Sequence, residues 1–345
     1  MPKARKQQPP VRPSKPADES RPSLLELDRF STENLSQWRR LSGDLDEIND
    51  LLYFGVEPQR QRLYGEMMEA LQSVAPVSLS FKRWARVVTY RYSLNPLSAA
   101  GSLTGYGGRF NIGHDVDKAM RAPWPALYIG EDFETAFREK FQLSRDERVD
   151  GLSPEELALT TSFSATYLDG RLEQVFDLDQ PGALDALCAV LNKMKLPNEA
   201  HKIQRRLKIP ASGVFMIRTV KRLRSETLTK NWRVMPVQFG LPAPSQILAS
   251  LILDAGFEAI RYPSTKGNGS CIAVFPHKLT SNKSYVALSD APPPGVTHTK
   301  LDMNSAEDLC GWELLRPSQR PTDSLFAMEK PWTGFTTERK TGGGS

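Results

Sequence analysis

Apolar side chains between residues 24 and 74 recur at spacings of three and four, which is the period of a helix with one buried face. Ser31 or Thr32 stands where a hydroxyl would cap the start of such a helix. We therefore predict a helical N-terminal cap over residues 24–80. Its apolar positions are Leu24, Leu25, Leu27, Leu35, Trp38, Leu41, Leu51, Leu52, Phe54, Leu63, Met67, Met68 and Leu71.

The period changes after this cap, where β-branched and aromatic residues replace the helical spacing. Residues 86–92, with the sequence Arg-Val-Val-Thr-Tyr-Arg-Tyr, predict a strand. Glycines then cluster over 101–113 and indicate loops with tight turns. A short apolar strand is predicted over 126–130, and a helix opens near Thr135 with Asp132 as its candidate N-cap.

The second half of the chain alternates between strand and helix patterns. Strands are predicted at 174–178, 259–262 and 271–275, and helices at 183–194 and 245–255. Gly256 follows the last of these helices and suits a left-handed cap. Residues 195–233 are basic and less regular, so we interpret them as an insertion.

Together these patterns favour an α+β fold, with a mixed or antiparallel β core of two small sheets and helices around it. We predict a disordered basic tail over 1–23, the helical cap, and a central domain over 81–288. Residues 289–345 are proline-rich and weakly periodic, which predicts an irregular, extended C-terminal arm.

The net charge of +5 first suggests a nucleic-acid partner. Most of the excess lies in residues 1–23, which hold six Lys and Arg residues against two acids and are rich in proline. Such a tail is more often a solvating segment than a nucleic-acid arm, and it lacks the interleaved aromatic rings of a single-strand binding groove. Nucleic-acid binding by the tail and the insertion stays the non-enzyme alternative.

Two further classes are disfavoured by composition. The chain has no apolar run of about 18 residues and no apolar segment of signal-peptide type after its basic start, which favours a protein of the cytoplasm without a membrane span. Its three cysteines, Cys188, Cys271 and Cys310, are widely spaced and predict reduced, partly buried side chains. No metal site is expected.

Chemistry is suggested by the segment Gly107-Gly108-Arg109 and by Arg91. Glycines let backbone amides approach an anion, and a guanidinium offers a planar fork for phosphate oxygens. Tyr90 and Tyr92 flank Arg91 and supply rings that stack on a base or ribose. Each feature alone is better explained as a turn or as a surface ion pair.

Five motifs in order resemble the RES domain, a family named for its arginine, glutamate and serine. They are YRY at 90–92, GGRFN at 107–111, ALY at 126–128, ETAFRE at 134–139 and GFEAIRYPS at 256–264. Members are typically toxins of RES-Xre toxin-antitoxin pairs, with a fold similar to diphtheria-toxin-type ADP-ribosyltransferases. The resemblance covers residues 86–277, so it implies an ADP-ribosyltransferase-like core and a RES-like NAD-binding catalytic domain over 81–288.

The resemblance implies site residues by position. Glu139, Arg91, Tyr128 and Ser264 are expected to be catalytic, with Ser245 as the alternative serine. The NAD-binding set is expected to be Arg91, Tyr92, Gly108, Arg109, Tyr128 and Ser264. His114 is an additional candidate for proton transfer, although a single histidine in a loop is usually a surface residue.

These residue types suit the cleavage of NAD, which enters as a substrate. Its pyrophosphate needs cations, and its positively charged nicotinamide is a good leaving group from the ribose. A carboxylate such as Glu139 can stabilise the oxocarbenium-like state that follows. The expected function is therefore a toxin-like enzyme that depletes NAD by hydrolysis or phosphorolysis, and ADP-ribosyl transfer to a protein is the enzymatic alternative.

The resemblance also implies partners. An enzyme that depletes NAD must be restrained in its host, so an antitoxin or immunity protein is expected, and self-association into a homo-oligomer is compatible with the helical cap. Delivery into the cytoplasm of a target cell is the alternative route to the same compartment.

Overall fold

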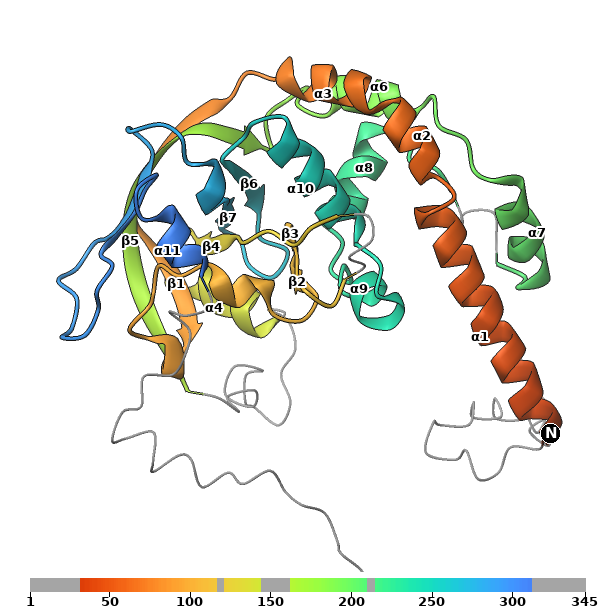
Figure 1. Cartoon of the computed structure of the whole chain (residues 1–345), viewed down its shortest axis with the longest axis horizontal. Coiled ribbons are helices and arrows are strands. Elements are labelled where there is room, and N and C mark those ends of the chain that lie inside the picture. Colours follow the sequence, from red (N-terminus) through yellow and green to blue (C-terminus); the bar gives the residue numbers. More distant parts are fainter. Residues whose placement is uncertain (1–31, 117–120, 144–161, 210–214, 312–345) are drawn as a thin grey trace, which may run out of the picture.

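The computed structural model describes residues 32–116, 121–143, 162–209 and 215–311, with side chains described from residue 40 onward. The basic tail and residues 312–345 lie outside this part of the chain. Within it, helices surround a strongly curved sheet, so the expected α+β class with a mixed β core is confirmed. Figure 1 shows the sheet near one end of the molecule and a long helix projecting at the other.

One seven-stranded sheet forms the centre of the molecule, in the order β1-β4-β7-β6-β5-β8-β9. The strands are β1 (Val77–Thr89), β4 (Leu127–Gly130), β5 (Phe163–Asp177), β6 (Ala259–Pro263), β7 (Ser270–Val274), β8 (Tyr285–Leu288) and β9 (Lys300–Leu301). Strand β1 pairs with both β4 and β5, so part of the sheet closes on itself. All pairs are antiparallel except β5 with β6.

Two small sheets were expected, and the structure differs. The other sheet is only a hairpin of β2 (Gly107–Gly108) and β3 (Asn111–Ile112). The long strands explain the difference, because β5 is 15 residues long and reaches β1, β6 and β8 in turn. The predicted strand at 174–178 overlaps only the end of β5. The apolar end of β5 is recognisable in a short stretch of sequence, whereas apolar and polar residues are mixed along the rest of the strand.

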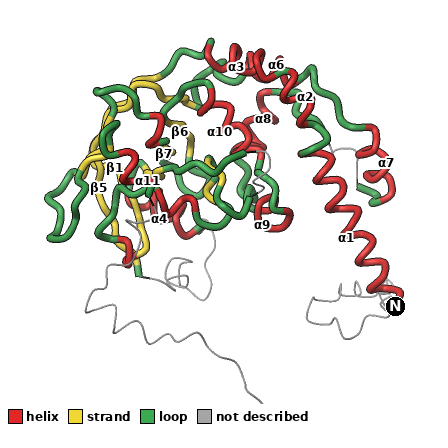
Figure 2. Tube along the Cα trace, viewed as in Figure 1, coloured by secondary structure: helices red, strands yellow, loops and turns green. Residues whose placement is uncertain are grey.

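Helices pack against different parts of this sheet, with α4 (Phe133–Phe141) near β1 in Figure 2 and α10 (Pro244–Asp254) on the part that carries β6 and β7. The largest apolar cluster joins α3 (Tyr64–Gln72), α6 (Asp185–Leu191) and α10 to strand residues such as Ile260 and Ala273. On another part of the sheet, α4 packs Ala136 and Phe137 against β1. Burial of these apolar faces is the main term that holds α4 and α10 in place.

From Thr32 to Gln72 the N-terminal region is helical, as predicted, and residues 24–31 of the predicted cap lie outside the described residues. This region contains α1 (Thr32–Tyr53), α2 (Glu57–Arg62) and α3, and the strand β1 already begins at Val77. Helix α1 extends away from the sheet and packs on α7 (Asn198–Arg206) through a small apolar cluster that includes Ile48 and Ile203. No helix of the described residues is long and apolar enough to cross a membrane.

The segment expected to be an irregular insertion contains helices in its described part. Besides α7, it holds α8 (Val220–Thr227) and leads into α9 (Val234–Phe239). The described part of the C-terminal arm, residues 289–311, is also more regular than predicted. Strand β9 and α11 (Ala306–Cys310) pack Leu301, Ala306 and Leu309 into the core. The pattern around these three apolar positions is too short to register as a periodic element.

Candidate functional site

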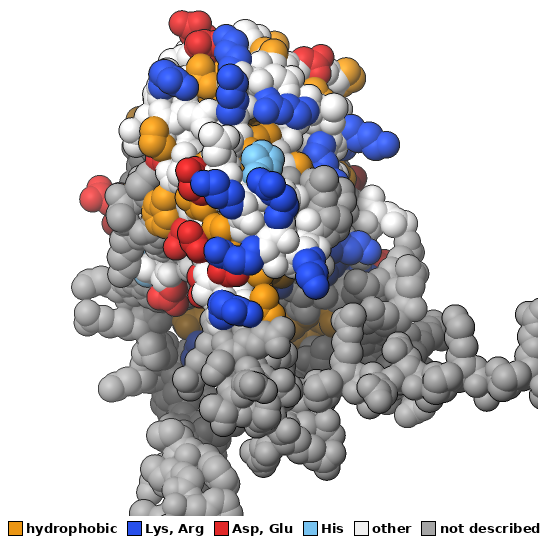
Figure 3. Space-filling model, turned by 90° about the vertical axis from the view of Figure 1, so that its right-hand side faces the viewer, with side chains coloured by type: hydrophobic (Ala, Val, Ile, Leu, Met, Phe, Trp, Pro, Cys, Tyr) orange, Lys and Arg blue, Asp and Glu red, His pale blue; other side chains and the backbone are white. Residues whose placement is uncertain are grey.

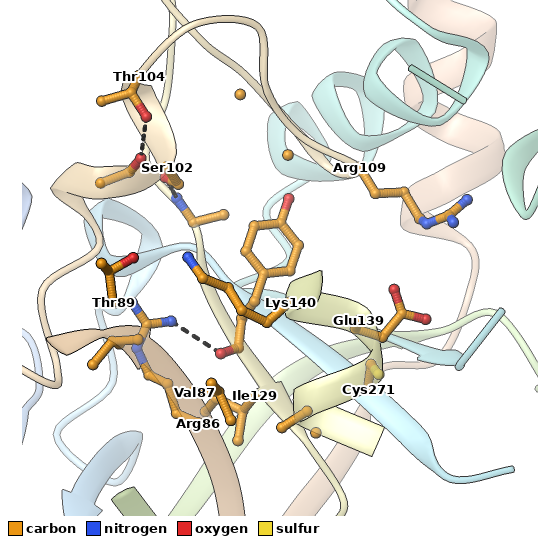
Figure 4. A pocket seen from close by; sticks show the side chains of 18 of the residues that line it. Arg86, Val87, Thr89, Ser102, Thr104, Arg109, Ile129, Glu139, Lys140 and Cys271 are labelled. Carbon is orange, nitrogen blue, oxygen red and sulfur yellow. Dashed lines mark hydrogen bonds between the residues drawn. The ribbon is translucent and has the colours of Figure 1, made fainter. Parts of the chain in front are cut away.

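A pocket of about 510 Å³ opens between β1, β4, α4 and the β2–β3 hairpin. Its floor includes Tyr262 and Cys271 from the neighbouring strands β6 and β7, and Trp232 with Arg233 supplies a further wall. Figure 4 shows several of these side chains directed into the pocket. The volume lies within the range of about 300–1,000 Å³ that is usual for small-molecule sites.

The glycine hairpin owes its shape to close backbone contacts. Gly107 has a φ of +85°, a conformation that side chains rarely adopt, and a Cβ there would meet the backbone of Asn111 and Gly113. At Gly108 a Cβ would collide with the hydroxyl of Tyr128. Only glycine therefore allows the hairpin to lie against the tyrosine at this wall of the pocket.

Two buried amide side chains hold this hairpin. Asn111 Nδ2 donates to the carbonyls of Ser102 (2.7 Å) and Trp124 (3.1 Å), while its Oδ1 accepts from the Gly108 amide (2.9 Å). Gln246 of α10 is fully buried and donates from Nε2 to the carbonyls of Gly108 and Asn111 in the hairpin and of Tyr106 just before it. The hairpin is therefore fixed from both sides before any ligand arrives.

Tyr128 is part of the same network. Its hydroxyl donates to Asn111 Oδ1 and accepts from the Phe110 amide, each at 2.9 Å. Burial raises the pKa of this phenol, and the Phe110 amide only partly opposes that change. The hydroxyl is thus a neutral support of the hairpin, while the side chain still lines the pocket.

Glu139 presents its carboxylate from the last turn of α4. The helix begins at Asp132, whose side chain accepts from the Thr135 amide at 2.7 Å, so the predicted N-cap is confirmed. Glu139 Oε1 accepts from Ser264 Oγ (2.7 Å) and from the Thr265 amide (2.9 Å). Among the described residues no donor bonds Oε2, and the Glu139 side chain lines the pocket.

Ser264 lies behind Glu139 rather than on the pocket wall. Its hydroxyl oxygen accepts from the amides of Lys266 (3.1 Å) and Gly267 (2.9 Å) while it donates to Glu139. Ser245, the alternative serine, is buried on α10 and does not line the pocket. The structure therefore brings Ser264, and not Ser245, to the glutamate.

Arg109 is 4% exposed, and its guanidinium is bonded to protein groups. Nη1 donates to the carbonyls of Thr229 (2.8 Å) and Thr227 (3.3 Å), and Nη2 donates to Thr265 Oγ1 (2.8 Å). Burial lowers its pKa, and the nearby charge of Glu139 partly compensates. Arg109 ties the end of α8 to the turn that orients Glu139.

Arg86 and Lys140 add positive charge that sequence reasoning did not include. Arg86 donates to the carbonyls of Tyr128 (3.0 Å) and Ser98 (2.8 Å), and burial lowers its pKa to about 10. Partial enclosure also lowers the pKa of Lys140, with further contributions from the like charges of Arg86 and Arg233. Five Lys and Arg residues line the pocket, against Glu139 as the one acid of its described lining.

Arg91 and Tyr92 both line the pocket, but not at the end of a strand as predicted. Strand β1 ends at Thr89, and a 3₁₀ turn over Tyr90–Tyr92 carries the arginine, which lies over the Tyr92 ring at 4.7 Å. Three residues of the predicted strand leave the sheet because the chain turns toward Asn95, with the Asn95 amide bonded to the Tyr92 carbonyl at 2.9 Å.

The pocket thus gathers most of the predicted residues from distant segments. Arg91, Tyr92, Gly108, Arg109, Tyr128 and Glu139 line it, and Ser264 supports it. His114 is exposed and lies outside the lining. Sequence reasoning missed Arg86, Lys140, Trp232, Arg233 and Gln246, and only the adjacent Trp232 and Arg233 in a basic segment offered a signal.

Comparison with known families bears on this pocket. The sequence model of one family, described as the RES domain, matches residues 83–292. The chain belongs to the RES domain family. The matched range begins inside β1 and ends just after β8, so it contains every residue that lines the pocket.

Comparisons of this RES domain protein with individual proteins add little to the family membership. A search of curated proteins found no match. Among solved structures, the chain is similar to one in the crystal structure of the M. tuberculosis MbcT-MbcA toxin-antitoxin complex, with 13% sequence identity and a TM-score of 0.36. That alignment covers 71% of this chain and 97% of the other.

Proposed function

We propose that this RES domain protein is a toxin-like enzyme that cleaves the bond between nicotinamide and ribose in NAD. The observation that carries the proposal is the state of Glu139. Its Oε1 is fixed by Ser264 and Thr265, its Oε2 accepts no hydrogen bond from the described residues, and every other charged side chain of the described lining is a cation.

The electrostatics of the pocket suit this dinucleotide. Its pyrophosphate is attracted to a lining with five cations. Nicotinamide leaves as a neutral molecule with the bonding electron pair, so its positive charge passes to the ribose. A carboxylate held in place stabilises that charge without having to reorganise. The Glu139 oxygen that accepts no hydrogen bond is the one available to the ribose and its 2′-hydroxyl.

The remaining roles follow from the pocket wall. We propose that Tyr128 and Tyr92 bound the nucleoside parts of NAD, and that Gly108 keeps the wall beside them free of a side chain. The core would be ADP-ribosyltransferase-like, and a protein partner of antitoxin type would restrain the enzyme, as the family membership suggests. The acceptor is water, phosphate or a protein side chain.

The decisive measurement is release of nicotinamide by the wild-type protein and by Glu139→Gln. The glutamine keeps an oxygen that accepts from Ser264 and Thr265 but removes the charge, so the rate should fall on the order of 10²–10³-fold with an unchanged melting temperature. Glu134→Gln is the matched control, because Glu134 lies on the same helix and its exposed side chain pairs with Arg138.

The products identify the acceptor. Free ADP-ribose indicates hydrolysis, ADP-ribose 1-phosphate indicates phosphorolysis, and labelled protein indicates transfer. Absence of nicotinamide release by the wild-type protein, tested with phosphate and with cell extract as a source of acceptors, would refute the proposed function. Equal rates for Glu139→Gln and Glu134→Gln would refute the role of Glu139.

A further inference from the structure

The cations of the pocket differ in what already binds them. Arg109 has a guanidinium that donates to two carbonyls and a hydroxyl. Arg86 donates to two carbonyls. Neither side chain can turn toward a phosphate without leaving buried carbonyl groups unpaired, which is costly. Arg109 and Arg86 therefore support the structure of the pocket and add positive charge to it.

Lys140 is different. Among the described residues no carboxylate, carbonyl or hydroxyl bonds its ammonium, although the side chain lines the pocket. In Figure 4 the side chain points away from Glu139 and toward the side of the pocket that carries Ser102 and Thr89, whereas Arg109 points out of this region. An ammonium that no described residue bonds, directed toward a wall with two hydroxyl-bearing residues, is suited to phosphate oxygens.

The other two cations are held by aromatic rings. Arg91 lies over Tyr92 at 4.7 Å, and Arg233 lies over Trp232 and Tyr106 at 5.1 and 5.9 Å. These contacts fix the direction of each guanidinium without pairing its charge. Lys140 alone among the five combines a flexible stem with a position on the α4 wall, one residue from Glu139.

We propose that Lys140, and not Arg109, is the cation that contacts the diphosphate of the substrate, while Arg109 is a positioning residue that holds residues 227–233 against the pocket. The identity of the ligand rests on the proposed function, because NAD is the source of the diphosphate. Lys140 and Glu139 are consecutive residues of α4. The helix would therefore fix the spacing between the group that contacts the diphosphate and the carboxylate proposed to face the ribose.

The lowered pKa of Lys140 agrees with this assignment. Its ammonium is partly enclosed and lies near the charges of Arg86 and Arg233, so its positive charge is less favourable than in water. A bound diphosphate would neutralise that repulsion and would be drawn to this part of the wall.

The test is calorimetric binding of ADP-ribose, ADP and inorganic pyrophosphate, with nicotinamide riboside as the ligand without a diphosphate. Lys140→Gln should weaken binding of the first three by about 10- to 100-fold, the loss expected for a charge-assisted hydrogen bond, and leave nicotinamide riboside unchanged. Lys140→Arg should restore most of the affinity.

Two comparison variants make the result specific. Lys266→Gln removes a charge that is close to Glu139 and Arg233 but does not line the pocket, so binding should change less than threefold. Arg109→Lys keeps its charge and should bind pyrophosphate nearly as well as the wild type does. A strong loss in Arg109→Lys with none in Lys140→Gln would overturn the assignment.

The binding test separates this proposal from the proposed function. A wild-type protein that binds pyrophosphate through Lys140 but releases no nicotinamide would retain the diphosphate site and refute NAD cleavage. A wild-type protein that binds none of the three diphosphates would refute the site itself, whatever its rate with NAD.

Discussion

The part of the pocket around Glu139 and the part around Lys140 are built in opposite ways. Around Glu139, the polar groups of Ser264, Thr265 and Arg109 already bond one another. Around Lys140, the ammonium has no partner among the described residues. The first part is preorganised and the second is open to a ligand. A carboxylate that stabilises a brief charged state gains from fixed geometry, whereas a group that binds an anion gains from free donors.

The outer face of α7 shows that charge alone does not define a site. Figure 3 shows Lys and Arg side chains gathered on the side of the molecule that carries α7. Exposed basic residues there include Lys202, Arg205 and Arg206, and Arg206 pairs with Asp44 and Glu47. These charges are solvated or paired and lie outside the pocket, whereas Lys140 is partly enclosed within it.

Among the groups that support Glu139, the largest effect is expected for Arg109→Lys. The three bonds to Thr227, Thr229 and Thr265 come from two nitrogens of the guanidinium, and the single nitrogen of a lysine cannot occupy both positions. Carbonyl groups therefore lose their partner, and the free energy of unfolding should fall by about 1–3 kcal/mol. Nicotinamide release should fall at least tenfold through kcat. Urea unfolding and steady-state rates measure both. Unchanged stability would mean that Arg109 does not support the pocket.

A smaller effect is expected for Ser264→Ala. Glu139 keeps the Thr265 amide but loses the hydroxyl, so kcat should fall by about tenfold, which corresponds to roughly 1.4 kcal/mol, while KM changes little. Ser264→Thr retains a hydroxyl and should recover part of the rate. A rise in KM without a fall in kcat would instead place Ser264 in contact with the substrate.

The smallest effect is expected on the α7 face. The double change Lys202→Gln and Arg205→Gln removes two exposed charges outside the pocket, so turnover should change less than twofold and stability should stay within about 0.5 kcal/mol. A loss as large as that of Lys140→Gln would show that the general positive field drives binding. Strong, salt-dependent nucleic-acid binding that this variant abolishes would favour the non-enzyme alternative.

Much of the fold could be predicted from local patterns. The helices at 185–191 and 244–254 and the paired strands β6 and β7 lie where apolar spacing placed them, and Gly256 has the expected positive φ of 101°. The errors occur where long-range pairing overrides a local signal. The polar length of β5, the closure of the sheet through β1 and the packing of α11 depend on contacts that a short window does not contain.

The division into cap, central domain and arm stays a prediction. The structure shows that helices occupy the first region to Gln72 and that β1 begins at Val77. The roles of the individual site residues also stay predictions, since geometry shows only that they meet. Their meeting is informative because Ser264 and Glu139 are 125 residues apart and yet share a hydrogen bond.

By itself the sequence determined the glycines of the hairpin, the capped helix that carries Glu139 and the order of motifs that places the chain among RES domain proteins. These are local properties, set by backbone sterics, capping and residue spacing. Only the tertiary structure decided which cations are tied to protein groups and which serine reaches the glutamate. Those outcomes depend on hydrogen-bond partners from distant segments, because a buried polar group takes the nearest partner that the fold supplies.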